Sequence, residues 1–416
     1  MPRSKGNSTI LNLLKTYRMV PELRQQFNQS FTEEKYQAYL KDLDNIYPGH
    51  IDFRIAETPV FIPQWFTKKM LDACETIVDV IKNSKYLDQS EKAIPAQLKV
   101  PGEDLYPQFI CFDFGICEND IGELEPQLVE MQAFPSLFAW HCLMPEVSKK
   151  HFDLPDNYST YLNGFSKDSY LALLKKILLA DVHPENVILL ELFPHKQKTR
   201  VDFYATRDLT GVRPVCLTEI IREDKNLFYL NQGKKTPIYR IYNRIIFDEL
   251  LQQPLDIQEK GKLFQQELNV QWIPHPNWFY RVSKFGLPFI KHPYVPETHF
   301  LNEIKELPGD LENYVIKPLF SFAGQGVMID VTKEDAEHIS DPENWIIQRK
   351  VKYAPVVQTP DEPAKAEIRL FYFWEANADR PVAVNNLARL SKGKMIGVRY
   401  NKDKSWVGGS FCLFEQ

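Results

Sequence analysis

Residues 314–327 combine a lysine at the end of a predicted strand with a short loop that contains glycine. Three residues typical of strands lead into Lys317, and residues 327–329 predict a second strand. Glycine lets backbone N–H groups approach phosphate oxygens, and a lysine adds a point charge on the same anion. The pattern predicts a hairpin that folds over a triphosphate, with an ordinary surface hairpin as the alternative. The loop residues involved would be Ser321, Gly324, Gln325 and Gly326.

This loop is not a Walker A motif. No Gly-Lys-Ser or Gly-Lys-Thr follows it, and the residues after it do not predict a helix. Any phosphate site here therefore belongs to a hairpin and not to the start of a helix.

Three side chains with oxygen donors lie on two β-rich segments earlier in the chain. Asp113 lies within residues 109–116, and Glu130 and Gln132 lie two residues apart within residues 127–136. Residues two apart on a strand share a face, and Mg²⁺ takes carboxylate and amide oxygens as ligands. We predict these three residues as Mg²⁺ ligands. The alternative is that they are solvent-facing polar positions on amphipathic strands.

Basic side chains recur on later predicted strands. Arg240 and Arg244 share a face of the predicted strand 238–246, where they would pair with carboxylates of the fold or bind an anionic substrate group. Structural pairing is expected for at least one of them. The other candidates are Lys284 near a turn, the strand 345–351 with Gln348, Lys350 and Val351, and three arginines, Arg369, Arg389 and Arg399.

The elements that must position these residues alternate in type. Helical periodicity covers residues 8–45 and 62–84, and strands alternate with helices between residues 157 and 217. This alternation predicts a sheet of the α/β kind. We expect a mostly helical region at 1–100, an α/β domain with the metal-ligand strands at 101–260, and a nucleotide-binding part at 261–416.

Composition narrows the functional class. The 416 residues carry a net charge of −5, which gives no basic footprint for nucleic acid. The six cysteines form no Cys-x-x-Cys pair, and neither a signal peptide nor an apolar run of about 18 residues is evident. We therefore expect a cytoplasmic protein without a membrane or nucleic-acid partner.

The order of the motifs resembles the nucleotide-binding half of the ATP-grasp proteins. After the lysine hairpin come Ile-Ile-Gln, Glu-Ile-Arg-Leu-Phe, Asn-Asn-Leu-Ala-Arg and a late Gly-Gly. The metal strands usually follow this half, but here they precede it as Asp113 and Glu130-Met131-Gln132. This order is similar to that of the circularly permuted ATP-grasp ligases, such as the synthetase part of glutathionylspermidine synthetase. The resemblance covers residues 105–416.

The resemblance implies an ATP-grasp-like α/β (α+β) fold in permuted order and an ADP-forming ligase that joins a small-molecule acid to an amine. Amino-acid or peptide substrates would fit the family. ATP would be held by Lys284, Lys317 and the glycine loop, with its adenine at residues 348–351, and Mg²⁺ by the three oxygen ligands. Arg399 would neutralise the transferred charge, with Arg389 and then Arg369 as the next candidates.

Two departures keep a second hypothesis open. Gln132 stands where the family has asparagine, and Cys111 stands where that synthetase has an arginine. An ATP-binding protein without ligase turnover, degenerate or dependent on a partner, is therefore an alternative. A third hypothesis is an interaction protein that binds no nucleotide, in which the glycine hairpin is only a turn. The oligomeric state is left open.

Overall fold

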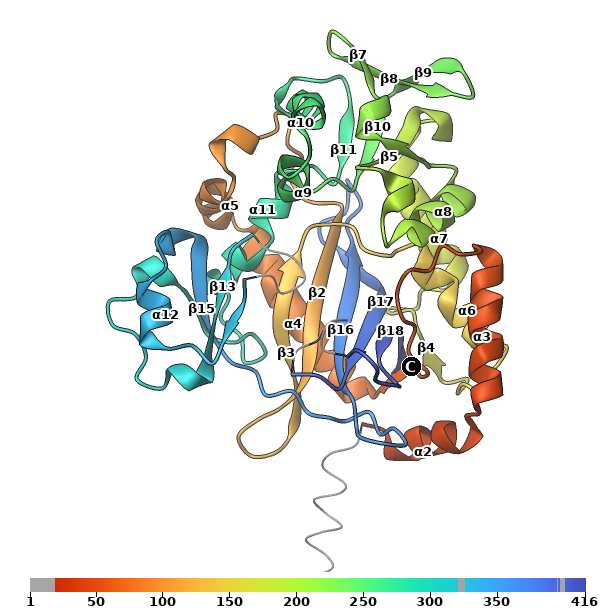
Figure 1. Ribbon diagram of the computed structural model, residues 1–416, viewed down its shortest axis with the longest axis vertical. Helices are drawn as coiled ribbons and strands as arrows, with labels where there is room; N and C mark the ends of the chain where they lie inside the picture. The colour runs from red at the N-terminus through yellow and green to blue at the C-terminus, as the bar shows by residue number, and fades with distance from the viewer. Residues whose placement is uncertain (1–18, 321–325, 395, 397–400) are drawn as a thin grey trace, which may run out of the picture.

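The computed structural model describes residues 19–320, 326–394, 396 and 401–416. They form a mixed α/β structure built around one antiparallel sheet, with two smaller sheets beside it (Figure 1). Among these residues, no helix combines the length and the apolar character needed to cross a membrane.

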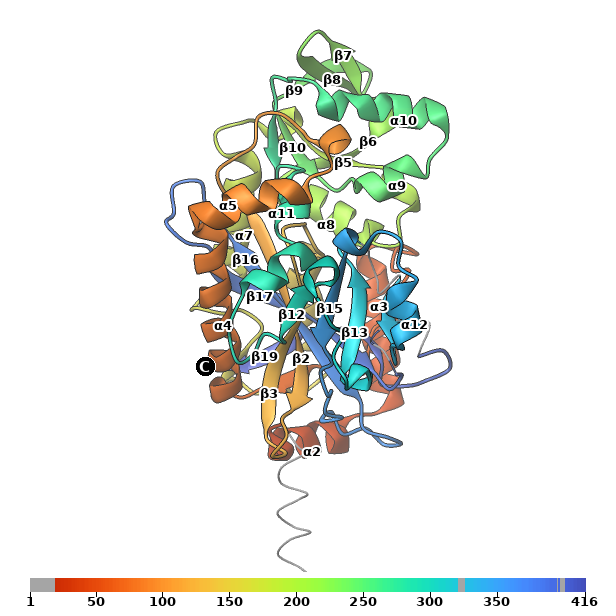
Figure 2. The same cartoon turned by 90° about the vertical axis from the view of Figure 1, so that its left-hand side faces the viewer.

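The central sheet has the strand order β18-β17-β16-β2-β3. Asp113, Glu130 and Arg369 are register partners and share one face, whereas the adjacent Met131 and Leu370 point to the other. The apolar face packs against helix α4 (Gln64–Lys82), which lies along the sheet (Figure 2). The opposite face is therefore left for polar side chains. The strands are β2 (Phe109–Glu118), β3 (Leu124–Gln132), β16 (Lys365–Phe373), β17 (Val382–Ser391) and β18 (Gly408–Ser410).

The small sheet carries the lysine hairpin. Its order is β12-β15-β13-β14, and β13 pairs with β14 on either side of the glycine loop, which confirms the predicted hairpin. It has its own apolar cluster, which includes Ile316 and Ile347. The elements are β12 (Thr298–Phe300), β13 (Tyr314–Pro318), β14 (Met328–Ile329), β15 (Trp345–Arg349) and helix α12 (Lys333–Glu337).

The third sheet is parallel, as the alternation of strands and helices predicts. Its order is β11-β10-β5-β6. The central strand β5 pairs with β6, the next strand along the chain, on one side and with β10 on the other. Residues 201–204 lie in helix α8. The elements are β5 (Val187–Glu191), β6 (Arg213–Cys216), β10 (Arg240–Asn243), β11 (Gln271–Ile273), α7 (Lys167–Leu179), α8 (Arg200–Thr210), α9 (Phe247–Leu251) and α10 (Leu255–Gly261).

The remaining elements extend or flank these sheets. An antiparallel group β7-β8-β9 projects at the top of Figure 1, and a mixed group β1-β19-β4 joins distant parts of the chain. The elements are β1 (Val60–Ile62), β4 (Tyr158–Ser159), β7 (Ile221–Glu223), β8 (Asn226–Asn231), β9 (Lys234–Ile238), β19 (Cys412–Glu415), α2 (Pro21–Ser30), α3 (Glu33–Ile46), α5 (Ser84–Ser90), α6 (Met144–Ser148) and α11 (Trp278–Arg281).

The boundary expected between residues 260 and 261 does not follow the sheets. β2 and β3 precede it, but β2 pairs along its length with β16 and so belongs to the same sheet as β17 and β18. Strand pairing between segments more than 240 residues apart leaves no signal in local composition, which is why the sequence suggested separate domains.

Candidate functional site

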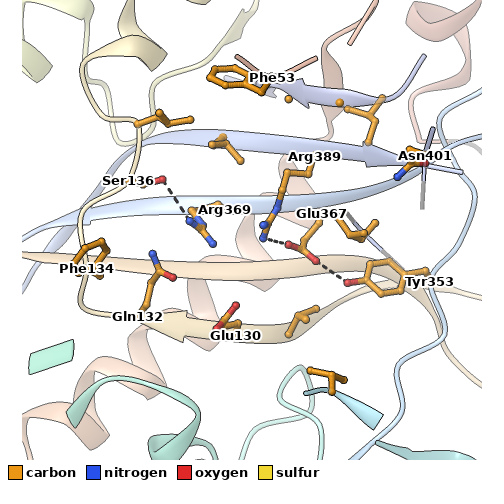
Figure 3. Close-up of a pocket in the computed structure, with 18 of the residues that line it drawn as sticks. Phe53, Glu130, Gln132, Phe134, Ser136, Tyr353, Glu367, Arg369, Arg389 and Asn401 are labelled. Carbon is orange, nitrogen blue, oxygen red and sulfur yellow. Dashed lines mark hydrogen bonds and ion pairs between the residues drawn. The ribbon is translucent and has the colours of Figure 1, made fainter. Parts of the chain in front are cut away.

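A cavity of about 680 Å³ lies against the polar face of the central sheet, where the small sheet and the parallel sheet meet it. The labelled side chains of β3, β16 and β17 in Figure 3 project into the same space. Within the described part of the chain, ten of the residues that the sequence suggested for ligand binding line this cavity: Glu130, Gln132, Arg244, Lys284, Lys317, Gln348, Lys350, Val351, Arg369 and Arg389.

Lys317 is the penultimate residue of β13 and reaches across to the central sheet. Its Nζ atom donates to Gln348 Oε1 at 2.6 Å and to the carbonyl of Val129 at 3.3 Å. Gln348 is itself fixed, because its amide nitrogen donates to Thr298 Oγ1 at 2.9 Å. Burial lowers the pKa of Lys317 to about 8, against the opposing effect of Glu130. The hairpin lysine is therefore a preorganised cation beside the metal-strand candidates.

Lys284 and Glu130 meet on the same side of the cavity. The Nζ atom of Lys284 lies 3.5 Å from a Glu130 carboxylate oxygen and 3.5 Å from the carbonyl of Leu319. Lys284 is buried, whereas the Glu130 side chain is 30% exposed. Gln132 lies on the same strand face and lines the same cavity. The structure thus brings both predicted lysines to the carboxylate of β3.

Asp113 lies at the centre of an ion-pair cluster. Both of its oxygens accept from Arg369, through Nε and Nη2 at 2.6 Å each, and Oδ2 also accepts from Arg389 at 2.7 Å. Asp113 is 1% exposed. Burial opposes its ionisation, but the two arginines outweigh this effect and hold the pKa of the carboxyl below its ordinary value. Asp113 therefore fixes two guanidinium groups beside the cavity.

Glu367 completes this cluster and was not identified from the sequence. It forms an ion pair with Arg389 and accepts from the hydroxyl of Tyr353 at 2.8 Å. The tyrosine ring packs over Gly115, where an added Cβ would lie only 2.7 Å from a ring carbon. The available signal was the spacing of Glu367 and Arg369, which places both on one strand face beside Asp113.

Arg240 and Arg244 have different roles. The Arg240 guanidinium donates to the carbonyls of Ile177 and Leu178 at the end of α7, so it is structural. Arg244 lines the cavity and donates to the carbonyl of Ser136 at 3.0 Å. The expectation that at least one of this pair is structural holds for Arg240, but its partners are two backbone carbonyls and the Gln271 side chain and not carboxylates of the fold.

Several predicted residues do not line the cavity or lie outside the described part of the chain. Ser321, Gly324, Gln325 and Arg399 lie outside the described residues. Gly326 has φ +74° and does not line the cavity, although the adjacent Val327 does. Lys350 lines the cavity while pairing with Asp330 at 2.9 Å.

The oxygen donors fit a magnesium ion only in part. Among the described residues, no three His, Cys, Asp or Glu side chains are grouped as a metal site. Glu130 and Gln132 present donors to the cavity, but the oxygens of Asp113 are already held by two guanidinium groups. Two protein donors still suit Mg²⁺, which completes its shell with water and substrate phosphates.

Comparison with known proteins shows a distant structural similarity. No family model and no curated protein matches the sequence. Among solved structures, a glutathione synthetase-like effector from Globodera pallida in its apo form is similar, with a TM-score of 0.55 and 9% sequence identity. The alignment covers 91% of this chain and 96% of that chain. At this level of identity the similarity concerns the fold.

Proposed function

We propose that the protein is an ATP-dependent carboxylate–amine ligase with an ATP-grasp-like fold in permuted order. The observation that carries this proposal is the convergence of Lys284, Lys317 and Glu130 with Arg369 and Arg389 around one cavity. These residues come from three regions far apart in the sequence. The glutathione synthetase-like fold of the Globodera pallida protein supports the same class.

In this proposal the small sheet binds ATP. Lys317 and Lys284 hold the phosphate chain as point charges. The backbone of the strand end at Lys350 and Val351 faces the adenine. Enclosure of the phosphates excludes water, which protects a reactive acyl phosphate from hydrolysis.

Glu130 and Gln132 would hold Mg²⁺, which when bound neutralises phosphate charge. We assign Asp113 a different role from the one its sequence position suggested. Because both of its oxygens bind arginine, it orients Arg369 and Arg389 toward the transferred phosphoryl group. Arginines held in this way stabilise developing charge without reorganisation at the moment of reaction.

The reaction proceeds in two steps. An oxygen of the acid's carboxylate attacks the γ-phosphorus of ATP, the bond to the β-phosphate oxygen breaks, and ADP leaves. The amine nitrogen then attacks the acyl carbon, inorganic phosphate departs, and the nitrogen loses a proton as the amide forms. Catalysis consists mainly of positioning and charge neutralisation.

Nucleotide binding is the first test. Calorimetry with ATP and Mg²⁺ should show binding that Lys317→Gln weakens, and ADP release should depend on both an acid and an amine from a panel. Absence of ATP binding would refute this proposal and leave the interaction-protein hypothesis standing.

A second candidate function is ATP binding without ligase turnover. It is favoured by Cys111, a buried thiol that lies on the polar sheet face beside Gln132 and directs its sulfur toward the carbonyl of Phe134 at 3.8 Å. A thiol there brings no positive charge to a transferred phosphate. Tight ATP binding with no acid-dependent ADP release, in the presence of all tested amines, would select this candidate.

A further inference from the structure

The cavity extends beyond the nucleotide side to the parallel sheet, where Arg244 after β10 and Lys198 and Thr199 before α8 line it; this part of the cavity is called the crevice below. The chain leaves β5 toward β6 on one side, and β10 pairs on the other, so this is the point where the strand order reverses. In open α/β sheets, ligands bind at the carboxyl ends of the strands at such a point. Arg244 directly follows β10, and α8 begins shortly after β5.

Arg244 is built to receive a ligand. It is 7% exposed, lines the cavity, and is held by the carbonyl of Ser136 and by the rings of Phe134 and Phe203, each about 5.4 Å from its central carbon. Its Nε atom is buried and has no hydrogen-bond partner among the described residues. A buried donor without a partner is costly, and a planar guanidinium suits a bidentate anion.

The start of α8 adds positive potential to the same crevice. Lys198 and Thr199 line the cavity immediately before this helix of 11 residues. Thr199 makes no side-chain capping bond. The dipole of a helix is positive at its N-terminus, which favours anions. Here the amides of Arg200 and Asp202 already donate to backbone carbonyls, and the buried carboxylate of Asp202 lies in the first turn, so the contribution of α8 is secondary to that of Arg244.

The charge of the whole cavity agrees with an anionic occupant. Ten of its lining residues are Lys or Arg and two are Glu. Four carboxylates outside the lining pair with some of these cations, namely Glu57, Asp113, Asp310 and Asp330. Asp52 also lies near Lys198, and Glu191, Asp202 and Glu249 lie near Arg244. The side chains that line the cavity are still mostly cationic, and a cationic lining attracts anionic ligands.

We infer that the acid substrate carries a second anionic group, which the crevice binds through Arg244, Lys198 and the start of α8. This inference rests on the proposed ligase function and names the substrate class of its site. The reacting carboxylate lies toward Arg369 and Arg389, and the second anion lies at Arg244. Arg244 and Arg369 are separated by Ser136, whose carbonyl accepts from Arg244 and whose hydroxyl accepts from Arg369.

The test uses the full chain saturated with Mg²⁺ and a non-hydrolysable ATP analogue. Calorimetry would compare dicarboxylates from succinate to pimelate with their monoamides, which keep the length but lose one charge. We expect at least one dicarboxylate to bind about tenfold or more tightly than its monoamide, as for a charged hydrogen-bonded pair. A phosphonocarboxylate of the same length shows whether carboxylate or phosphate is preferred, and either preference supports an anion.

Substitutions test which residues bind the second anion. Lys198→Gln and Arg244→Gln should remove most of the preference for the dicarboxylate, whereas Lys196→Gln, an exposed neighbour that does not line the cavity, should keep it. If Arg244→Gln does not fold, Arg244→Lys and Lys198→Gln carry the test.

The inference fails if acids and monoamides bind equally to the unmodified protein. It also fails if the preference survives in the folded crevice variants. In each case the nucleotide isotherm still tests the ligase proposal separately, whereas failure of the analogue to bind overturns both.

Discussion

ATP affinity should fall as the pH rises above about 8, because the hairpin lysine loses its proton there. Burial and the charge of Lys284 lower the pKa of Lys317, Glu130 and Glu367 oppose this shift, and the net pKa is about 8. A bound triphosphate favours the charged form and so raises this pKa. Binding above pH 8 must therefore take up a proton, and affinity decreases with pH until the lysine of the complex also titrates.

The magnitude follows from the fraction of protein that is protonated. At pH 9 about nine-tenths of the free protein carries neutral Lys317, so the affinity for ATP should be roughly tenfold, or about 1.4 kcal/mol, below its plateau. The assay is calorimetry with ATP and Mg²⁺ from pH 7 to 9.5 in buffers of different ionisation enthalpy, which measures proton uptake directly.

Two variants make this test specific. Lys317→Arg keeps a charge that does not titrate in this range, and Lys317→Gln has none, so both should show flat pH profiles at different affinities. The reasoning is refuted if the unmodified protein is as flat as Lys317→Arg, or if binding at pH 9 takes up no proton.

Three further predictions concern the central sheet. Asp113→Asn should lower the free energy of unfolding by about 3 kcal/mol in urea titrations, because it leaves two buried arginines without their shared carboxylate. The unmodified protein should lose the same stability at acidic pH, as the pH falls to the depressed pKa of this carboxyl. Glu130→Gln should raise the Mg²⁺ concentration needed for ATP binding by roughly tenfold, while an unchanged magnesium requirement would remove Glu130 from the proposed site. Gly115→Ala should destabilise the fold by about 1–3 kcal/mol, since its Cβ would overlap a tyrosine ring, and Gly309→Ala, which meets nothing within 4 Å, should be nearly neutral.

The strand faces of several candidate site residues could be predicted because side chains alternate between the two faces of a strand. Glu130 and Gln132 share a face through local spacing alone, and the lysine hairpin followed from strand propensity and glycine. The role of Asp113 was not readable in the same way. Its arginine partners lie more than 250 residues away in sequence, so the same carboxylate that suggested a metal ligand is instead enclosed by cations.

The sequence by itself determined the elements and their polar faces, because those depend on residue propensity and on periods of two or 3.6 residues. It also indicated, through the order of the motifs, that early oxygen donors and late lysines act together. Only the tertiary structure decided which charges meet. Pairing of β2 with β16 placed Asp113 between two arginines, and the reversal of strand order beside β10 placed Arg244 at the cavity, since burial and long-range pairing set the partners of a charge and no local pattern encodes them.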